Sequence, residues 1–308
     1  MDDLDEVIAR AQADLGPPEG EPVAMEGGIT NRNFRMRFGA TDYVLRLCSK
    51  DTEVLGIDRV AELAATRAAH AAGVAPAVAL FLPEHACLIT RFVEGRNVDA
   101  SELRVPAVMA QVAASIRAVH EGPRFPAAFS AFRSVESCRD ETLRRGGTVP
   151  PEYDVAAALA DRIEAALTGP EHEPVPCHND LLTANFIAAG APDPRIVIVD
   201  WEYAGMGDRF FDLGNLSTNN AFSDADDAVL LSAYFGEPAA GPAFEAHFAA
   251  LRLMRLMSDF REAMWGVVQT VVSELDFDYA AYAAAHFARL RAAASDPRLE
   301  RWLRDAAP

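Results

Sequence analysis

The 308-residue sequence has only one lysine, Lys50, and every other basic residue is an arginine. Acidic residues outnumber basic ones by 46 to 28, which gives a formal net charge of −18. A chain this acidic lacks the basic footprint that a nucleic-acid phosphate backbone requires, so nucleic-acid binding is not expected. Its negative field would favour a cationic small substrate, although acidity can also serve only solubility.

Cysteine is also scarce, with four residues, and no two cysteines form a CxxC pair, so a structural zinc site is not expected. Isolated cysteines are more often small buried hydrophobic residues in a reducing compartment. The N-terminal residues lack the basic and apolar regions of a signal peptide, and no uncharged apolar run could span a bilayer. We therefore expect a cytoplasmic protein with no membrane segment. The cysteines are Cys48, Cys87, Cys138 and Cys177.

The composition is that of a globular protein, with 50% hydrophobic and 24% charged residues, and the length suffices for two lobes with separate cores. In residues 1–93, the spacing of apolar residues predicts a helix, three strands, a second helix and two more strands. Gly16 ends the first helix and Gly73 the second. The helices are expected at 3–15 and 57–72, and the strands at 22–26, 33–38, 42–48, 77–82 and 86–93.

Residues 94–308 have a different character, because long alanine-rich helices dominate them. A strand–loop–strand segment at 174–200 interrupts these helices and includes the run Arg-Ile-Val-Ile-Val-Asp. We therefore predict an α+β protein with a small sheet-rich lobe at 1–93 and a larger helical lobe at 94–308. The helices are expected at 105–120, 152–168, 225–235, 243–273 and 278–295.

The most informative segment is Cys-His-Asn-Asp-Leu-Leu-Thr-Ala-Asn-Phe-Ile at 177–187, followed by Asp200 at the end of an apolar run. Phosphoryl transfer needs a carboxylate that accepts the proton of the attacking hydroxyl, and oxygen ligands that hold magnesium. Asp180 fits the first role, and Asn185 and Asp200 fit the second. Each residue alone would more often only shape a turn. His178, just before Asp180, is expected to hold the loop rather than act as a base.

Three segments together resemble the catalytic core of choline and ethanolamine kinases, a group within the aminoglycoside phosphotransferase superfamily. They are 178–185, Asp-Trp-Glu-Tyr at 200–203, and Arg-Phe-Phe-Asp-Leu-Gly-Asn at 209–215. The resemblance implies a bilobal protein-kinase-like fold with ATP in the cleft. It also implies Asp180 as catalytic base and Asn185 and Asp200 as Mg²⁺ ligands. Asp212 is expected to have a structural role.

The segment Glu-Gly-Gly-Ile-Thr-Asn at 26–31 lies between two predicted strands. Two glycines allow the backbone to approach phosphate oxygens, although such a turn can also be only a hairpin. The segment resembles the nucleotide loop of choline kinases, which implies nucleotide contacts from Gly27, Gly28, Thr30 and Asn31.

A kinase also needs a cation on its third strand, paired with a helix glutamate, to hold the α- and β-phosphates. Lys50 lies beyond the predicted strand, so Arg46 is the better candidate, and Glu62 on the next helix is its expected partner. A surface ion pair is the alternative. The residues Arg91, Phe92 and Val93 fit a hinge between the lobes, and the resemblance implies that backbone groups there bind adenine.

The C-terminal helices carry Arg-Glu-Ala-Met-Trp-Gly-Val-Val-Gln at 261–269, which resembles the choline-site segment of choline kinases. The resemblance implies that Trp265, Phe277 and Tyr282 surround the acceptor cation through cation–π contacts. Core packing is the alternative for these aromatic residues. Glu262 stands where choline kinases often have a second tryptophan, so the aromatic cage is less complete. Glu202 and Tyr203 are also expected near the acceptor.

We therefore predict an ATP-dependent kinase that phosphorylates the hydroxyl group of choline or a related cationic amino alcohol. Two alternatives of the same superfamily stay open, a thiamine kinase and an aminoglycoside kinase, of which the latter would have a wide acidic cleft without an aromatic cage. A non-catalytic, nucleotide-binding pseudokinase is a third alternative, but it should lack the base or a metal ligand. The sequence does not indicate the oligomeric state.

Overall fold

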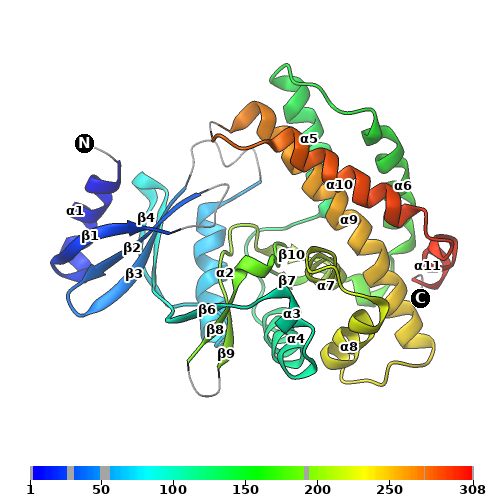
Figure 1. Ribbon diagram of the computed structural model, residues 1–308, viewed down its shortest axis with the longest axis horizontal. Coiled ribbons are helices and arrows are strands. Elements are labelled where there is room, and N and C mark those ends of the chain that lie inside the picture. The colour runs from blue at the N-terminus through cyan, green and yellow to red at the C-terminus, as the bar shows by residue number, and fades with distance from the viewer. Residues whose placement is uncertain (1–2, 26–30, 49–55, 191–193, 274, 307–308) are drawn as a thin grey trace.

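The computed structural model describes residues 3–25, 31–48, 56–190, 194–273 and 275–306. A twisted sheet and a helical body lie side by side along the longest axis of the molecule (Figure 1). The predicted bilobal α+β architecture, similar to that of protein kinases, is confirmed.

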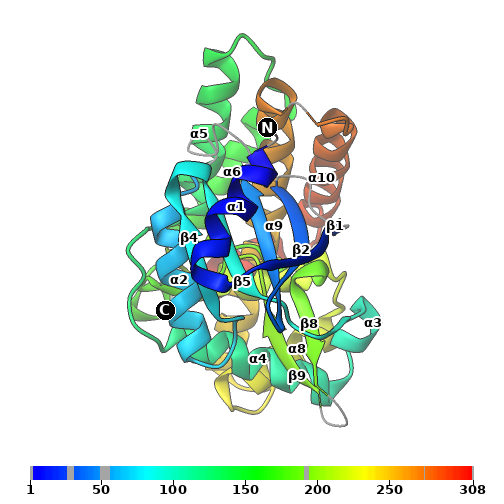
Figure 2. The ribbon, with the colours of Figure 1, turned by 90° about the vertical axis from the view of Figure 1, so that its left-hand side faces the viewer.

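The first lobe contains a five-stranded antiparallel sheet with the order β1-β2-β3-β5-β4. Helix α1 (Asp3–Leu15) packs on this sheet, and their contact forms a small separate core that includes Val7, Phe38 and Leu45. Figure 2 shows α1 in front of the strands. The strands are β1 (Pro18–Ala24), β2 (Asn31–Phe38), β3 (Thr41–Cys48), β4 (Val78–Leu82) and β5 (Cys87–Arg91).

Helix α2 (Arg59–Ala71) belongs to the first lobe by sequence but packs into the core of the second. Asp58 caps its N-terminus by accepting hydrogen bonds from the amides of Val60 and Ala61 at 2.8 and 3.0 Å. Its alanine face, including Ala65 and Ala69, joins the large hydrophobic cluster of the helical lobe. This helix therefore connects the two lobes mechanically.

The chain leaves the five-stranded sheet after Arg91 and enters a second sheet at Gly95. This sheet has the order β6-β8-β9, and a separate two-stranded ladder pairs β7 with β10. The predicted strand–loop–strand segment forms most of both. The boundary at residues 93 and 94 stays a prediction. These strands are β6 (Gly95–Asn97), β7 (Val175–Cys177), β8 (Phe186–Ala189), β9 (Arg195–Ile198) and β10 (Gly205–Gly207).

Helix α9 (Pro242–Val272) is the central element of the second lobe, since α5, α7 and α10 all pack against it. Figure 1 shows it crossing the helical body beside α10. The other helices are α3 (Ala100–Leu103), α4 (Pro106–His120), α5 (Ala131–Arg144), α6 (Glu152–Ala166), α7 (Arg209–Asn219), α8 (Asp224–Phe235), α10 (Tyr279–Ala294) and α11 (Leu299–Asp305).

The five helices expected in the second lobe are present within about two residues of their predicted ends. Four helices were not predicted, namely α3, α5, α7 and α11. The predicted strand at 22–26 begins earlier, at Pro18, because an irregularity between Glu19 and Val23 lets the strand continue through Gly20.

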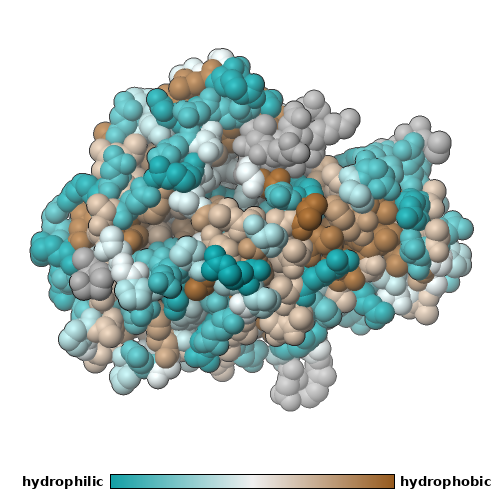
Figure 3. All heavy atoms as spheres, turned by 180° about the vertical axis from the view of Figure 1, so that it is seen from behind, coloured by the Kyte–Doolittle hydropathy of each residue, from teal (hydrophilic) through white to brown (hydrophobic). Residues whose placement is uncertain are grey.

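Hydrophilic residues spread over both lobes in the view from behind, and hydrophobic ones lie among them (Figure 3). Among the described helices, none combines the length and the apolarity that a membrane crossing requires.

Candidate active site

The predicted catalytic loop, which carries Asp180, runs between β7 and β8, and side chains of α7 hold its backbone. Asp212 accepts hydrogen bonds from the amides of His178 and Asn179 at 2.8 and 2.6 Å. Asn215, one helical turn later, accepts a hydrogen bond from the amide of Leu181 at 2.6 Å. The i, i+3 spacing puts both side chains on the same face of α7. The expected structural role of Asp212 agrees with these contacts.

Inside the loop, Asn179 adopts a positive φ of 65°, a conformation that asparagine tolerates better than most residues. His178 accepts a hydrogen bond from the Asp180 amide through Nδ1 at 3.2 Å and donates through Nε2 to the carbonyl oxygen of Val199 at 3.0 Å. Burial lowers the pKa of His178, so the ring is neutral and fits this donor–acceptor pattern. His178 thus positions the loop, as the sequence predicts.

Asp180 is buried, and its carboxylate lies 3.5 Å from the guanidinium of Arg261 on α9. Burial raises the pKa of Asp180 well above its ordinary range, while the charge of Arg261 lowers it. Asn185 donates from its amide nitrogen to the backbone oxygen of Asp180 at 2.9 Å, which leaves its amide oxygen available as a ligand. The predicted base, Asp180, and one predicted metal ligand, Asn185, therefore lie in the same loop and contact each other.

Asp200 follows β9 and has a positive φ of 69°, an uncommon conformation for aspartate that positions its side chain at the cleft. It lines the same cavity as Asn185 and Arg46. An aspartate carboxylate and an amide oxygen are the hard oxygen donors that Mg²⁺ prefers. The residues present therefore fit a magnesium site in which Asn185 and Asp200 would be the protein ligands.

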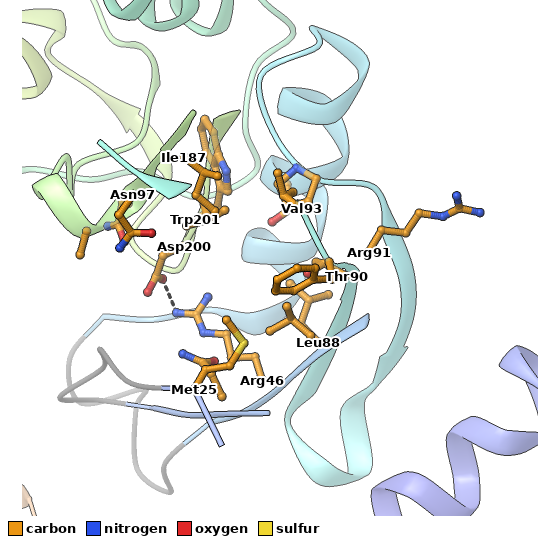
Figure 4. Close-up of a pocket in the computed structure, with 18 residues that line it drawn as sticks. Met25, Arg46, Leu88, Thr90, Arg91, Val93, Asn97, Ile187, Asp200 and Trp201 are labelled. Atoms are coloured by element: carbon orange, nitrogen blue, oxygen red, sulfur yellow. Dashed lines mark hydrogen bonds and ion pairs between the residues drawn. The ribbon is translucent and has the colours of Figure 1, made fainter. Parts of the chain in front are cut away.

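Arg46 on β3 forms the centre of an ion-pair cluster that connects the lobes. It donates to Glu62 of α2 at 2.7 Å, and it also pairs with Asp200 and, at 3.0 Å, with Glu202. Arg59 pairs with Glu62 and Glu202 at 2.8 and 3.1 Å. Figure 4 shows the guanidinium of Arg46 directed at the carboxylate of Asp200. The expected Arg46–Glu62 pair is thus present, and it is buried rather than at the surface.

The structure puts Glu202 in this cluster, beside Arg46, and not near the acceptor as expected from the sequence. Asn31 at the start of β2 donates to Glu202 at 2.9 Å and so adds a further link between the lobes. Gly27, Gly28 and Thr30, the other residues expected in the nucleotide loop, lie outside the described residues.

The predicted hinge residues Arg91, Phe92 and Val93 line the cavity together with Leu88 and Thr90 of β5. In Figure 4 the side chain of Arg91 points away from the cavity, so this residue faces it only through its backbone. The Phe92 amide donates to the carbonyl of Asp42 at 2.9 Å. Among the described residues, no such backbone hydrogen bond involves the Val93 amide, so that amide could contact a base.

Apart from Glu202, the expected acceptor residues form one cluster near Arg261, which lies 3.5 Å from the carboxylate of Asp180. The ring of Trp265 lies edge-on to those of Tyr279 and Tyr282, with centroids 5.7 and 5.6 Å apart, and its Nε1 donates to the hydroxyl of Tyr203 at 3.0 Å. The ring centroid of Phe277, which is 41% exposed, lies 6.0 Å from that of Tyr282. Helices α9 and α10 bring this cluster together.

Two residues at the site were not assigned a role from the sequence. Arg261 donates to Glu262 at 2.6 Å and lies 4.2 Å above the Tyr203 ring. Arg59 forms ion pairs with Glu62 and Glu202, two carboxylates that Arg46 also contacts. The i, i+3 spacing of Arg59 and Glu62 on one helix could have indicated this ion pair from the sequence. For Arg261 the sequence offered no comparable signal, because its partners Asp180 and Tyr203 are distant in the chain.

Comparison with known proteins gives consistent results. The phosphotransferase enzyme family matches residues 22–248. A choline/ethanolamine kinase family protein from Mesorhizobium loti is 30% identical in sequence, with a TM-score of 0.79 and 99% of each chain covered. Ethanolamine kinase 2 of Mus musculus is 25% identical over 294 residues, which cover 88% of this chain and 75% of the mouse protein.

Choline kinase LicA from Streptococcus pneumoniae has a TM-score of 0.79 at 20% identity, with 94% of this chain and 98% of LicA covered. At that identity the likeness shows a shared fold. LicA has also been solved in complex with AMP.

Proposed function

Because this chain belongs to the phosphotransferase enzyme family, and within it to the choline/ethanolamine kinases, we propose that it transfers the γ-phosphate of ATP to the hydroxyl of choline or a related amino alcohol. The observation that carries this proposal is the position of Asp180 between two unlike sites. On one side lie the metal-ligand candidates Asn185 and Asp200 with Arg46. On the other lie Arg261, Glu262 and the aromatic cluster.

In the proposed reaction, the acceptor hydroxyl is oriented by the carboxylate of Asp180, which takes the hydroxyl proton as the new O–P bond forms. The bond between the γ-phosphorus and the bridging oxygen breaks, and ADP leaves with that bond's electron pair. Mg²⁺ held by Asn185 and Asp200 would neutralise phosphate charge. Arg46 is proposed to contact the α- and β-phosphates, and its partners Glu62 and Glu202 hold its guanidinium in place.

The proposed nucleotide site is the cavity between β3, β5 and the catalytic loop. Val44, Leu88 and Trp201 give it apolar walls suited to an adenine ring. Backbone groups of residues 91–93 would provide its polar contacts. Gly27, Gly28 and Thr30 stay predicted phosphate contacts.

An aminoglycoside acceptor is the rival that the geometry favours less. It would need a wide acidic cleft, whereas Trp265 and Tyr282 pack edge to ring beside Glu262. A pseudokinase would lack the base or a metal ligand, whereas Asn185 and Asp200 line the cavity and Asp180 is hydrogen-bonded to Asn185 through its backbone oxygen.

The direct test is to measure ATP-dependent phosphorylation of choline, ethanolamine, thiamine and kanamycin by wild-type protein and by Asp180→Asn. We expect amino-alcohol product from wild type, and a loss of turnover of at least about 100-fold in the variant with nucleotide affinity retained. If Asp180→Asn stays within a few fold of wild type, Asp180 is not the base. Product from kanamycin alone would establish the rival function.

A further inference from the structure

The acceptor side of the site contains a buried carboxylate with bonding capacity left over. Glu262 is only 3% exposed. One of its oxygens accepts a hydrogen bond from Arg261 at 2.6 Å, and the other accepts one from the Tyr282 hydroxyl at 2.6 Å. A carboxylate oxygen can accept two hydrogen bonds, so each retains a place for another donor.

Several aromatic rings near Glu262 already contact other groups of the protein. The guanidinium of Arg261 lies over the Tyr203 ring at 4.2 Å, a cation–π contact that an acceptor cation would otherwise make. Trp265 and Tyr282 contact each other edge to ring, and Tyr282 directs its hydroxyl at Glu262. A quaternary ammonium depends on open aromatic faces, because it has no N–H group to donate.

We propose that Glu262 selects acceptors with a primary ammonium group over those with a quaternary one. This inference rests on the proposed function and specifies its acceptor. A primary ammonium offers three N–H donors, and a charge-assisted hydrogen bond to a buried carboxylate is among the stronger polar contacts in proteins. A trimethylammonium group at the same place would desolvate Glu262 without giving it a hydrogen bond.

Arg261 links this carboxylate to the catalytic base. The same Nη1 atom that donates to Glu262 at 2.6 Å lies 3.5 Å from the carboxylate of Asp180. The two carboxylates are therefore separated by less than the combined length of those contacts. An ammonium at Glu262 and a hydroxyl at Asp180 thus belong to a short molecule, such as an alcohol with two carbons between nitrogen and oxygen.

Arg261 also explains how a glutamate can be buried here. An unpaired buried carboxylate would take up a proton rather than bear its desolvation cost. The charge of Arg261 and the hydroxyl of Tyr282 lower the pKa of Glu262 against the opposing effect of burial. The carboxylate therefore stays ionised and can attract a cationic acceptor.

The test is a series of four acceptors whose number of N–H groups falls from three to none: ethanolamine, N-methylethanolamine, N,N-dimethylethanolamine and choline. We expect kcat/KM of the wild-type enzyme to fall along the series, by about tenfold or more from the first to the last. Equal values, or a preference for choline, would overturn the inference while leaving the kinase function intact. No product from any of the four would instead contradict the proposed function.

A substitution then tests whether Glu262 is responsible. Glu262→Gln keeps the shape of the side chain and removes its charge, so the preference for ethanolamine over choline should shrink to within about threefold. The KM for ATP should stay unchanged. Glu245→Gln, on the same helix but ion-paired with Arg301 at the surface, is the matched control and should keep the wild-type preference. A full preference retained in Glu262→Gln would refute the role of Glu262.

Discussion

The role proposed for Asp180 conflicts with its environment, since a catalytic base must be ionised while burial favours the protonated form. Burial raises the pKa of Asp180, and the positive charge of Arg261 is the largest effect that lowers it. The guanidinium of Arg261 is shared with Glu262, so it compensates Asp180 only in part. If Asp180 is the base, as proposed, this residue lowers the stability of the fold in exchange for function.

This conflict predicts a pH-dependent gain in stability on Asp180→Asn. A carboxyl group whose pKa is raised in the folded state stabilises the fold at low pH, and that contribution is lost as the pH rises through the raised pKa. At pH 7 the variant should therefore gain free energy of unfolding, on the order of 1–2 kcal/mol. The gain should shrink toward pH 4.5. Urea unfolding of both proteins at the two pH values measures it, and a variant less stable at pH 7 would contradict it.

Trp265 belongs to the core and is also proposed to line the acceptor site, so the choice of substitution matters. It is 6% exposed, and alanine in its place would cost about 3–5 kcal/mol of stability. Trp265→Phe keeps an aromatic ring and removes the Nε1–H that donates to Tyr203.

We expect Trp265→Phe to raise the KM for the amino alcohol by about threefold to tenfold, because Tyr203 loses the donor that fixes it. The KM for ATP should change little. Measuring both constants together with the melting temperature distinguishes the two roles. A large fall in melting temperature with parallel changes in both KM values would indicate that Trp265 is only a core residue.

At the scale of elements, side chains of α7 hold the predicted catalytic loop. The distance between α7 and α9 therefore determines where this loop lies. Gly214 lies between Asp212 and Asn215, the residues that hold the loop. A Cβ atom at position 214 would lie 2.8 Å from the backbone carbon of Met254 and 2.9 Å from the nitrogen of Arg255. The two helices can approach this closely only with glycine there.

Gly214→Ala should therefore destabilise the protein although alanine favours helices. The intrinsic helix gain is about 1 kcal/mol, whereas overpacking costs typically about 1–3 kcal/mol and here meets backbone atoms that cannot change rotamer. We expect a lower melting temperature and a reduced kcat, because α7 and the loop shift together. An unchanged or higher melting temperature would show that the helices can separate without cost.

Four helices were not predicted, and their sequences explain why. Helix α5 buries mainly small or polar residues at helical spacing, namely Ala131, Val135, Cys138 and Thr142. The rest of the segment is mostly charged or polar, so it differs from the alanine-rich helices that the sequence analysis picked out. Helix α7 contains an internal glycine and is buried almost all round, so it lacks the polar face that marks an amphipathic helix. Helices α3 and α11 are short.

At the scale of the whole molecule, the two lobes meet through a charged cluster as well as through the apolar face of α2. Arg46 of the first lobe contacts Asp200 and Glu202 of the second, and Arg59 and Asn31 also reach Glu202. Arg46 therefore connects the two lobes and is also the side chain proposed to hold the phosphates.

Arg46→Lys should weaken ATP binding more than acceptor binding. Lysine keeps the charge but has one nitrogen, so it cannot contact Glu62, Asp200 and Glu202 in the geometry of a guanidinium. We expect the KM for ATP to rise about tenfold, with the acceptor KM within about twofold. Arg37→Lys is the matched control, because Arg37 lies on neighbouring β2 and pairs with Asp42 at the surface. A similar effect in both variants would contradict a specific role for Arg46.

The sequence by itself determined the order of elements in the first lobe, the five long helices of the second and the family to which the chain belongs. These depend on short-range information, because apolar spacing and turn residues act within one element. The segment around Asp180 was recognisable for the same reason, since its base and one metal-ligand candidate lie five residues apart.

Only the tertiary structure decided the charged environment of the site. Glu202 and Tyr203 are neighbours in sequence, yet one contacts Arg46 and the other lies beneath Arg261. Arg261 meets Asp180 across 81 positions of the chain. The ion-pair partner of each guanidinium depends on side-chain direction and on burial. Both are fixed only when the helices of the two lobes pack together.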